Sequence, residues 1–203
     1  AIGKQAANNL TTGYANIFIG HRVANSGIIT GNNNNAQGYA ALATLTTGSN
    51  NLAHGYASMT TVCTGSDNIG LGQFTLAKGN GNMNIAIGSC SMCNNTSGSC
   101  NIAMGYAAMK SITTGSYNIA QGYKTLYGNT SGNHNIALGY CALWCNTTGS
   151  HNVAIGFCAL LNNSTGCGNI SIGCKSLGCN TFGNNNVAIG PFTLARNTTG
   201  NYN

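Results

Sequence analysis

Residues 135–151 read NIALGYCALWCNTTGSH, and this 17-residue unit decides the fold because the whole chain repeats it. We count its first Asn as repeat position 0. This Asn recurs every 17 residues, except for one interval of 18 and one of 16, at 16, 34, 51, 68, 84, 101, 118, 135, 152, 169, 186 and 203. A Gly follows each Asn at position 4 wherever the chain continues that far. A fixed period of this length predicts a solenoid with one repeat in each coil.

Positions 1 to 3 alternate as a β-strand does. Position 1 is mostly Ile or Val, and position 3 is mostly Ile, Leu or Met, with Gln37, His54 and Gln121 as exceptions. Position 2 is nearly always Ala or Gly. We expect positions 1 and 3 to fill the coil interior and position 2 to lie on an outer face. A face of small residues permits close approach of another chain, so self-association there is expected, with a smooth-faced monomer as the alternative.

A second short strand is expected after the position-4 Gly, because position 5 is often Tyr or Phe and position 8 is mostly Leu or Met. The unit then closes with Asn-Thr-Thr-Gly, a turn sequence. No apolar spacing typical of a helix persists. The sequence therefore predicts an all-β parallel β-solenoid of about twelve 17-residue coils and no helices. Stacked coils would form a rod roughly 55–60 Å long. Residues 1–203 are expected to form a single continuous array, part of a longer chain or filament.

The composition argues against catalysis. Only 4% of the 203 residues are charged, and Asp67 is the only acid, so paired carboxylates for acid–base chemistry do not exist. No glycine-rich phosphate loop leads into a helix, so we expect no enzyme activity and no cofactor. No apolar stretch reaches the roughly 20 residues of a membrane span, so no membrane insertion is expected.

Seven basic residues give a net charge of +6 and are spread along the sequence. Nucleic-acid binders usually cluster such residues, so we expect no nucleic-acid partner. Solvated side chains that aid solubility are the simpler interpretation, and adhesion to acidic glycans or lipids is the alternative. The basic residues stand at positions 5, 6, 9 and 10, which must then be exposed: Lys4, Arg22, Lys78, Lys110, Lys124, Lys175 and Arg196.

Identical polar residues in successive coils predict ladders of hydrogen bonds. The Asn at position 0 can bond its copies in the coils on either side, and Thr at position 12 can form a hydroxyl ladder. We interpret both ladders as structural. The Asn ladder is expected to contain Asn51, Asn68, Asn84, Asn101, Asn118, Asn135, Asn152, Asn169 and Asn186.

Ten cysteines in a chain so poor in charge favour an oxidising, extracellular compartment and disulfides. Seven stand at the same positions as the basic residues, and Cys141 could bond Cys158 between coils instead of a partner in its own coil. The candidate disulfide residues are Cys90, Cys93, Cys141, Cys145, Cys158, Cys174 and Cys179. No metal site is expected, because the Cys90–Cys93 pair lacks a second pair and the stacked His134 and His151 lack a third ligand.

Three segments of the repeat resemble a known family: NIAIG at 84–88, HNIALGY at 134–140 and NNVAIG at 185–190. They are similar to the head repeats of YadA-like trimeric autotransporter adhesins and to repeats of phage and virus tail fibres. The resemblance implies a left-handed parallel β-roll, packed as a homotrimer, displayed at a cell or virion surface and used for attachment. A host-surface glycan or protein receptor is the partner that it implies.

Three functions follow as hypotheses. The first is a structural or adhesive extracellular fibre, which the repeat over the whole chain favours. The second is an ice-binding solenoid that uses the Thr ladder. The third is a head-to-tail filament subunit, because both ends of the array look like ordinary repeats and polar capping repeats normally stop stacking.

Overall fold

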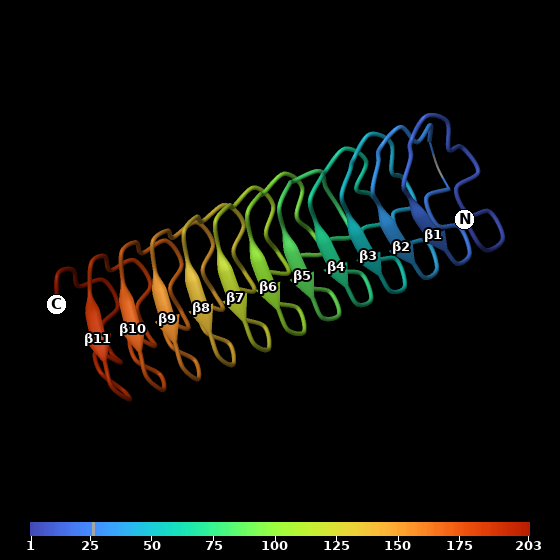
Figure 1. Ribbon diagram of the computed structural model, residues 1–203. Helices are drawn as coiled ribbons and strands as arrows, with labels where there is room; N and C mark the ends of the chain where they lie inside the picture. Colours follow the sequence, from blue (N-terminus) through green and yellow to red (C-terminus); the bar gives the residue numbers. More distant parts are fainter. Residues whose placement is uncertain (26) are drawn as a thin grey trace.

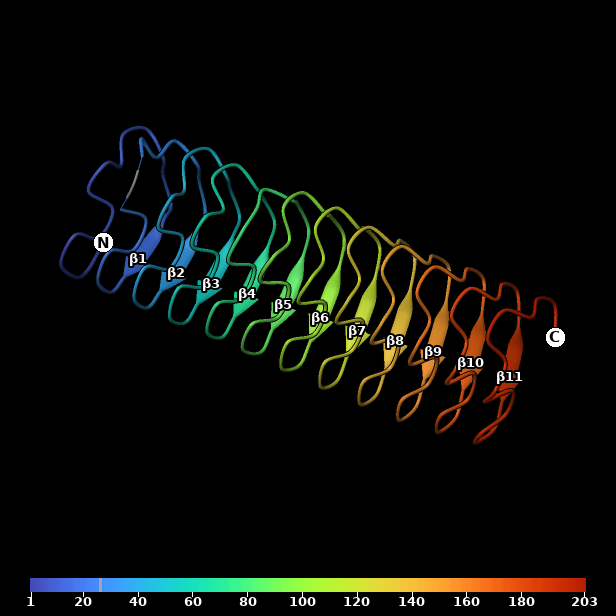
Figure 2. The same cartoon turned by 180° about the vertical axis from the view of Figure 1, so that it is seen from behind.

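The computed structural model describes residues 1–25 and 27–203 and shows one parallel β-solenoid with its two termini at opposite ends of the rod (Figures 1 and 2). Within these residues there is no helix, and eleven strands form a single sheet in sequential order. Each strand has three residues: Ile17–Ile19 (β1), Asn35–Gln37 (β2), Leu52–His54 (β3), Ile69–Leu71 (β4), Ile85–Ile87 (β5), Ile102–Met104 (β6), Ile119–Gln121 (β7), Ile136–Leu138 (β8), Val153–Ile155 (β9), Ile170–Ile172 (β10) and Val187–Ile189 (β11). The solenoid predicted from the repeat is confirmed, with eleven strands in the described chain for about twelve expected coils.

The strands stay in register even where the repeat length changes. Ile17 pairs with Asn35 across the 18-residue interval, and Ile69 pairs with Ile85 across the 16-residue interval. Lys78 still pairs with Thr61, its counterpart one coil earlier, so the missing residue falls in the turn that follows Lys78. Changes in length are therefore absorbed outside the sheet.

The second strand expected at positions 5 to 8 is not formed in the described coils, and this prediction is wrong. In β8's coil, residues 139–145 form bends and turns instead. Main-chain hydrogen bonds still join the coils there. The Cys141 amide donates to the carbonyl of Tyr123 in the preceding coil, and the Leu143 amide donates to the carbonyl of Ala159 in the next coil. Because neighbouring coils satisfy these groups, the segment needs no strand geometry.

The inward and outward faces of the strand are the reverse of our expectation. The middle residue of each strand is buried, while the flanking residues are intermediate or exposed. Position 2 is small because the interior leaves no room: a Cβ on Gly70 would lie 2.9 Å from the Cγ of Met59. The polar residues at position 3, Gln37, His54 and Gln121, lie on the solvent side, so they bury no unpaired group.

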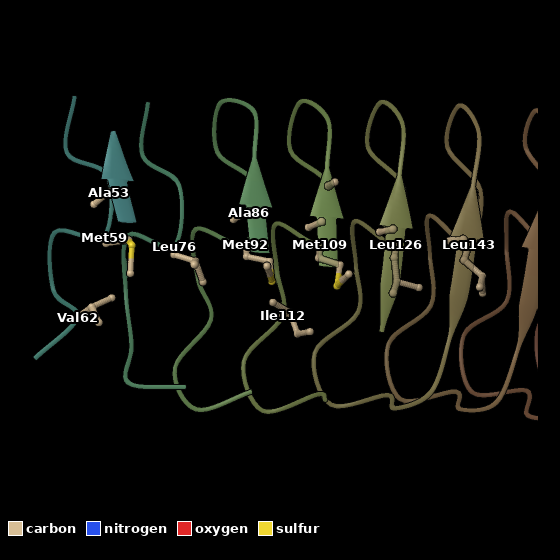
Figure 3. Packing of buried hydrophobic residues seen from close by; sticks show 14 of the residues in the cluster. Ala53, Met59, Val62, Leu76, Ala86, Met92, Met109, Ile112, Leu126 and Leu143 are labelled. Carbon is tan, nitrogen blue, oxygen red and sulfur yellow. The ribbon is translucent and has the colours of Figure 1, made fainter. Parts of the chain in front are cut away.

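Large side chains at position 8 form the core instead of the Ile columns. Leu76, Met92, Met109, Leu126 and Leu143 point into the coil interior in a row along the axis (Figure 3), and each is at most 3% exposed. The Ala residues of position 2 close the same space from the strand side. Burial of this row contributes the main stabilising free energy, because apolar burial scales with the area removed from water.

The non-glycine residues at positions 6, 8 and 16 have left-handed backbone conformations, with φ between 44° and 60°. Across all coils these positions hold no Val, Ile or Thr. A β-branched side chain resists positive φ, whereas Leu, Met, Ala and Lys tolerate it better. This constraint explains why the core row uses Leu and Met, although β-branched residues dominate the strands.

Glycine at position 4 is required by the stacking itself. Gly139 has φ of 126°, which disfavours any side chain, and a Cβ on it would lie 2.6 Å from the carbonyl oxygen of Gly156 in the next coil. The corner therefore brings successive main chains too close for any other residue.

Candidate functional site

The described residues offer surfaces rather than an enclosed site. They contain no group of three His, Cys, Asp or Glu side chains that could hold a metal ion. They also contain no helix long and apolar enough to cross a membrane. The features that could carry function are the polar ladders, the apolar face of the strands, the side with basic side chains and the ten cysteines.

The Asn residues at position 0 form a ladder in the interior. Each of the nine predicted residues donates from Nδ2 to Oδ1 of the Asn one coil earlier, at 3.0–3.2 Å. The same Nδ2 donates across the coil to a Gly carbonyl, as Asn118 does to Gly132 at 2.9 Å. Asn118 and its copies are buried. Both ends of each amide are engaged inside the protein, so the ladder closes the coil and offers nothing to a ligand.

A second Asn ladder, which our sequence analysis missed, lies at position 11. Asn146 donates to Oδ1 of Asn129 at 2.9 Å, and Asn163 donates to Asn146 at 2.9 Å. Asn180 and Asn197 extend the ladder in the same way. The first Asn of each Asn-Thr-Thr-Gly turn was the signal that could have revealed it. In earlier coils the same position holds apolar residues such as Leu45 and Val62.

The Thr residues at position 12 do not bond hydroxyl to hydroxyl as a rule. Thr113 Oγ1 donates to the carbonyl of Thr130 at 3.0 Å, and Thr130 Oγ1 donates to the carbonyl of Thr147 at 3.1 Å. The hydroxyl protons are therefore engaged with the main chain of the next coil. This arrangement stabilises the turn and leaves no row of free donors.

The outward face of the sheet is apolar. From β8 to β11, every outward residue at positions 1 and 3 is Ile, Leu or Val. Ile119, Ile170 and Ile189 are 37%, 37% and 65% exposed. Contiguous exposed apolar surface of this kind marks an interaction site in soluble proteins. Position 2, which we expected to provide the contact face, is buried and cannot do so.

Beside this face, the aromatic residues of position 5 stack along the axis. The rings of Tyr106, Tyr123, Tyr140 and Phe157 follow one another with centroids 5.0–5.5 Å apart and planes within 14°. Each ring is between 39% and 50% exposed. Since their faces cover one another, the rings present edges and hydroxyl groups to solvent.

Two shallow hollows lie between residues of positions 6 and 9, and we call the side of the coil that carries them, at positions 5, 6, 9 and 10, the basic groove. One hollow in it is lined by Arg22, Ala43 and Thr60, among others, and a second by Cys158, Lys175 and Cys179, among others. Of the seven basic residues, Arg22 and Lys175 line the hollows, and the other five stand at positions 5, 6, 9 and 10 of other coils, which stack in register on the same side. Asp67 stands at position 16, beyond the other end of the strand.

Aromatic rings hold two of these lysines. Lys124 Nζ lies 5.3 Å from the ring centroid of Tyr123 and 5.7 Å from that of Tyr127, while Lys110 Nζ lies 5.6 Å from Tyr127. A hydrogen bond with Tyr127 raises the pKa of Lys110, and one with Tyr123 raises the pKa of Lys124. Both lysines are cationic at neutral pH, and their ammonium groups lie within the distance at which rings attract cations.

The ten cysteines, all within the described residues, are free thiols, so the disulfides expected at Cys90, Cys93, Cys141, Cys145, Cys158, Cys174 and Cys179 are not formed. Stacked residues such as Cys141 and Cys158 have parallel Cβ directions at a coil spacing of about 4.8 Å. A disulfide requires Cβ atoms about 3.8 Å apart, so this stacking does not favour it. Burial raises the pKa of Cys93, Cys141, Cys145 and Cys158, which lowers their reactivity as thiolates.

The histidines that share position 16 lie in a short exposed stack. The rings of Tyr117, His134 and His151 follow one another with centroids 5.0 Å apart. The structure thus brings the two histidines together as expected, next to an aromatic ring.

No family model, curated protein or solved structure matches this chain.

Proposed function

We propose that the protein is a non-enzymatic structural and adhesive fibre component, exposed outside the cell at a cell or virion surface, that associates with copies of itself. The apolar outward face of the sheet is the observation that carries this proposal. It runs along the rod, and its residues from β8 to β11 are without exception aliphatic. A homotrimer, as the resemblance to YadA-like head repeats implies, and a larger filament are the two assemblies that such a face serves.

The chemistry of the face suits a second copy of the same surface. Both rows are formed by Ile, Leu, Val and Met, with few polar interruptions, and lie on a rigid parallel sheet. Packing such rows against one another removes apolar area from water without burying charge. The interior, in contrast, is filled by apolar rows and by the Asn ladders, so it contributes shape and stability rather than chemistry.

The test is the native mass of the non-reduced protein by light scattering. We expect a mass near three chains, or a large heterogeneous mass for a filament. The variant I119K/I170K places two charges on the outward face and is expected to give single chains. Its matched control, T114K/T148K, adds the same charges at exposed turn positions and is expected to keep the assembly. A single-chain mass for the wild-type protein would overturn the proposal.

The ice-binding alternative rests on the Thr residues at position 12. Their hydroxyl protons bond to main-chain carbonyls in the next coil, and the segment forms bends rather than a flat strand. These two observations weigh against it. Measured thermal hysteresis in the purified protein would restore this alternative.

A further inference from the structure

We propose that the basic groove binds an extended acidic polysaccharide laid along the solenoid axis. The inference deepens the proposed adhesive function by naming the class of partner, and it concerns a different side of the coil from the self-association face. Its experiment measures binding, so its failure is distinguishable from a failure of assembly.

The first observation is the one-sided charge. The seven basic residues are scattered in sequence, but the register of the coils aligns them at positions 5, 6, 9 and 10. The main-chain bond from Arg22 to Lys4, between adjacent coils, shows this alignment directly. The single acid, Asp67, instead accepts a hydrogen bond from Asn50 at position 16. The groove side therefore carries an uncompensated positive potential, which attracts polyanions.

The second observation is the groove's shape. The two hollows lie in different parts of the rod, yet the same repeat positions line them. Small residues such as Ala40, Ala43 and Gly178 line them beside the basic side chains of Arg22 and Lys175. Shallow hollows that recur on one side of the rod suit a linear chain laid along the axis better than a compact ligand.

The third observation is the spacing of the charges. Seven cations over a rod of roughly 55–60 Å give about one cation per 8 Å. A single nucleic-acid strand carries one phosphate per about 3.4 Å, far denser than this row. A polysaccharide that carries a carboxylate or sulfate on every sugar or every second sugar has sparser charges, which fit better.

The aromatic residues also favour a glycan over a nucleic acid. Single-stranded nucleic acids bind by stacking bases on free aromatic faces. The rings of Tyr106, Tyr123 and Tyr140 cover one another's faces at 5.0–5.5 Å, so these faces are occupied. What they expose is a row of phenol hydroxyl groups beside the lysines, and hydroxyl groups suit the hydrogen-bonding edges of sugars.

The experiment compares binding of the full chain to chondroitin sulfate, uncharged dextran, oligo-dT and vesicles containing phosphatidylserine. We expect chondroitin sulfate to bind most tightly, with an affinity that falls as salt is raised. Dextran is expected not to bind. Tighter binding of oligo-dT or of the vesicles, equal binding of dextran, or no binding of chondroitin sulfate would overturn the proposal.

Variants locate the interaction in the groove. K110Q/K124Q removes two charges next to Tyr127 and is expected to weaken chondroitin sulfate binding about tenfold. The control T114D/T148D lowers the net charge by the same amount at exposed turn positions and is expected to change affinity less than twofold. Equal losses in both variants would show a general charge effect and reject the groove as the site. Light scattering on each variant reports whether assembly is unchanged.

Discussion

Ile112 stands at repeat position 11 directly after Asn95, which holds position 11 in the preceding coil. Because the Ile112 side chain has no hydrogen-bond donor, Asn95 Oδ1 is left without a donor among the described residues. Further along the chain, Asn129, Asn146, Asn163 and Asn180 each receive a hydrogen bond from the Asn of the next coil. The Asn95 side chain is held only through Nδ2, which donates to the Gly98 carbonyl at 2.9 Å. Where the residues at position 11 change from apolar to polar along the rod, one buried oxygen, Asn95 Oδ1, is thus left unpaired.

Replacing Asn95 with Leu should therefore stabilise the protein. The change removes a buried oxygen that has no donor and restores the apolar side chain that Leu45 provides at this position. Gly98 keeps a donor, because Asn84 Nδ2 also bonds its carbonyl at 2.9 Å. We expect the free energy of unfolding to rise by about 1 kcal/mol in urea denaturation. The same change at Asn146, which is paired on both sides, should lower it by about 2 kcal/mol, and stabilisation of both variants would contradict this account.

The position-0 ladder should be costly to interrupt. Asn118 Nδ2 donates to Asn101 and Gly132, and its Oδ1 accepts from the main chain and side chain of Asn135. Asn118→Ala leaves these buried groups without partners, so we expect a loss of about 3 kcal/mol in the free energy of unfolding. Thr114→Ala, at an exposed turn position, should change it by less than about 0.5 kcal/mol. A loss below 1 kcal/mol for the Asn variant would show that the ladder is dispensable.

In the coil of β1, the large side chain stands at position 2 (Phe18) and the small one at position 8 (Ala24), which is the reverse of the later coils. Phe18 stands at position 2, where Ala is usual, and Ala24 stands at position 8, where Leu or Met is usual, and both are buried. Phe18→Ala should cost about 3–5 kcal/mol, because it empties the interior of this coil. Adding Ala24→Leu should recover most of that loss. Thermal denaturation of the single and double variants measures the coupling, and strictly additive effects would refute the exchange.

Because the backbone at position 8 is left-handed, Leu and Ile, which have equal volume, should differ in the stability that they give the protein there. Leu126 has φ of 50°, so Leu126→Ile forces a β-branched residue into a strained conformation. We expect a loss of about 1–3 kcal/mol in the free energy of unfolding. Leu126→Met is the control, since Met92 and Met109 hold the same position at φ of 48° and 49°. It should cost less than about 1.5 kcal/mol, and equal costs for both variants would exclude backbone strain as the cause.

The thiols should titrate according to their burial. Burial raises the pKa of Cys141 and Cys158 above the value of 9.0 for a free thiol. Both thiols are neutral well below pH 9 whether the chain is folded or unfolded, so this stabilising contribution is complete there. Above that pH the unfolded chain ionises first, so this contribution to stability is lost as pH rises.

Alkylation by iodoacetamide at pH 8.5, followed by mass spectrometry, checks this prediction. Cys141 and Cys158 should react more slowly than the exposed Cys179 in the folded protein. All ten cysteines should react after unfolding without a reductant. Cysteines that remain unmodified after unfolding would reveal disulfides and contradict the free thiols of the structure.

The sequence by itself determined the architecture, the coil length and the polar ladder at position 0. These follow from periodicity, because identical residues one coil apart must stack when parallel strands pair in register. It also identified the row of large apolar residues at position 8. For these features, local pattern and global fold agree.

Only the tertiary structure decided which side of each strand faces inward. Alternation places positions 1 and 3 opposite position 2 but does not say which side is enclosed. We assigned the interior to the Ile positions, whereas the side chain at position 8 leaves little room beside the strand, as Met59 does at Gly70. The polar residues Gln37, His54 and Gln121 at position 3 were the sequence signal for an outward face.

The alignment of the basic residues also required the structure. Along the sequence they are scattered at uneven intervals, and we interpreted them as solvated charges. Coiling at a 17-residue period brings positions 6, 9 and 10 of successive repeats to one side. Lys110 contacts Tyr127 in the next coil, and Lys124 contacts the same ring from position 6. The repeat position of each residue can be read from the sequence. Which positions lie side by side across a turn depends on the left-handed residues of that turn and on the close packing of the coil.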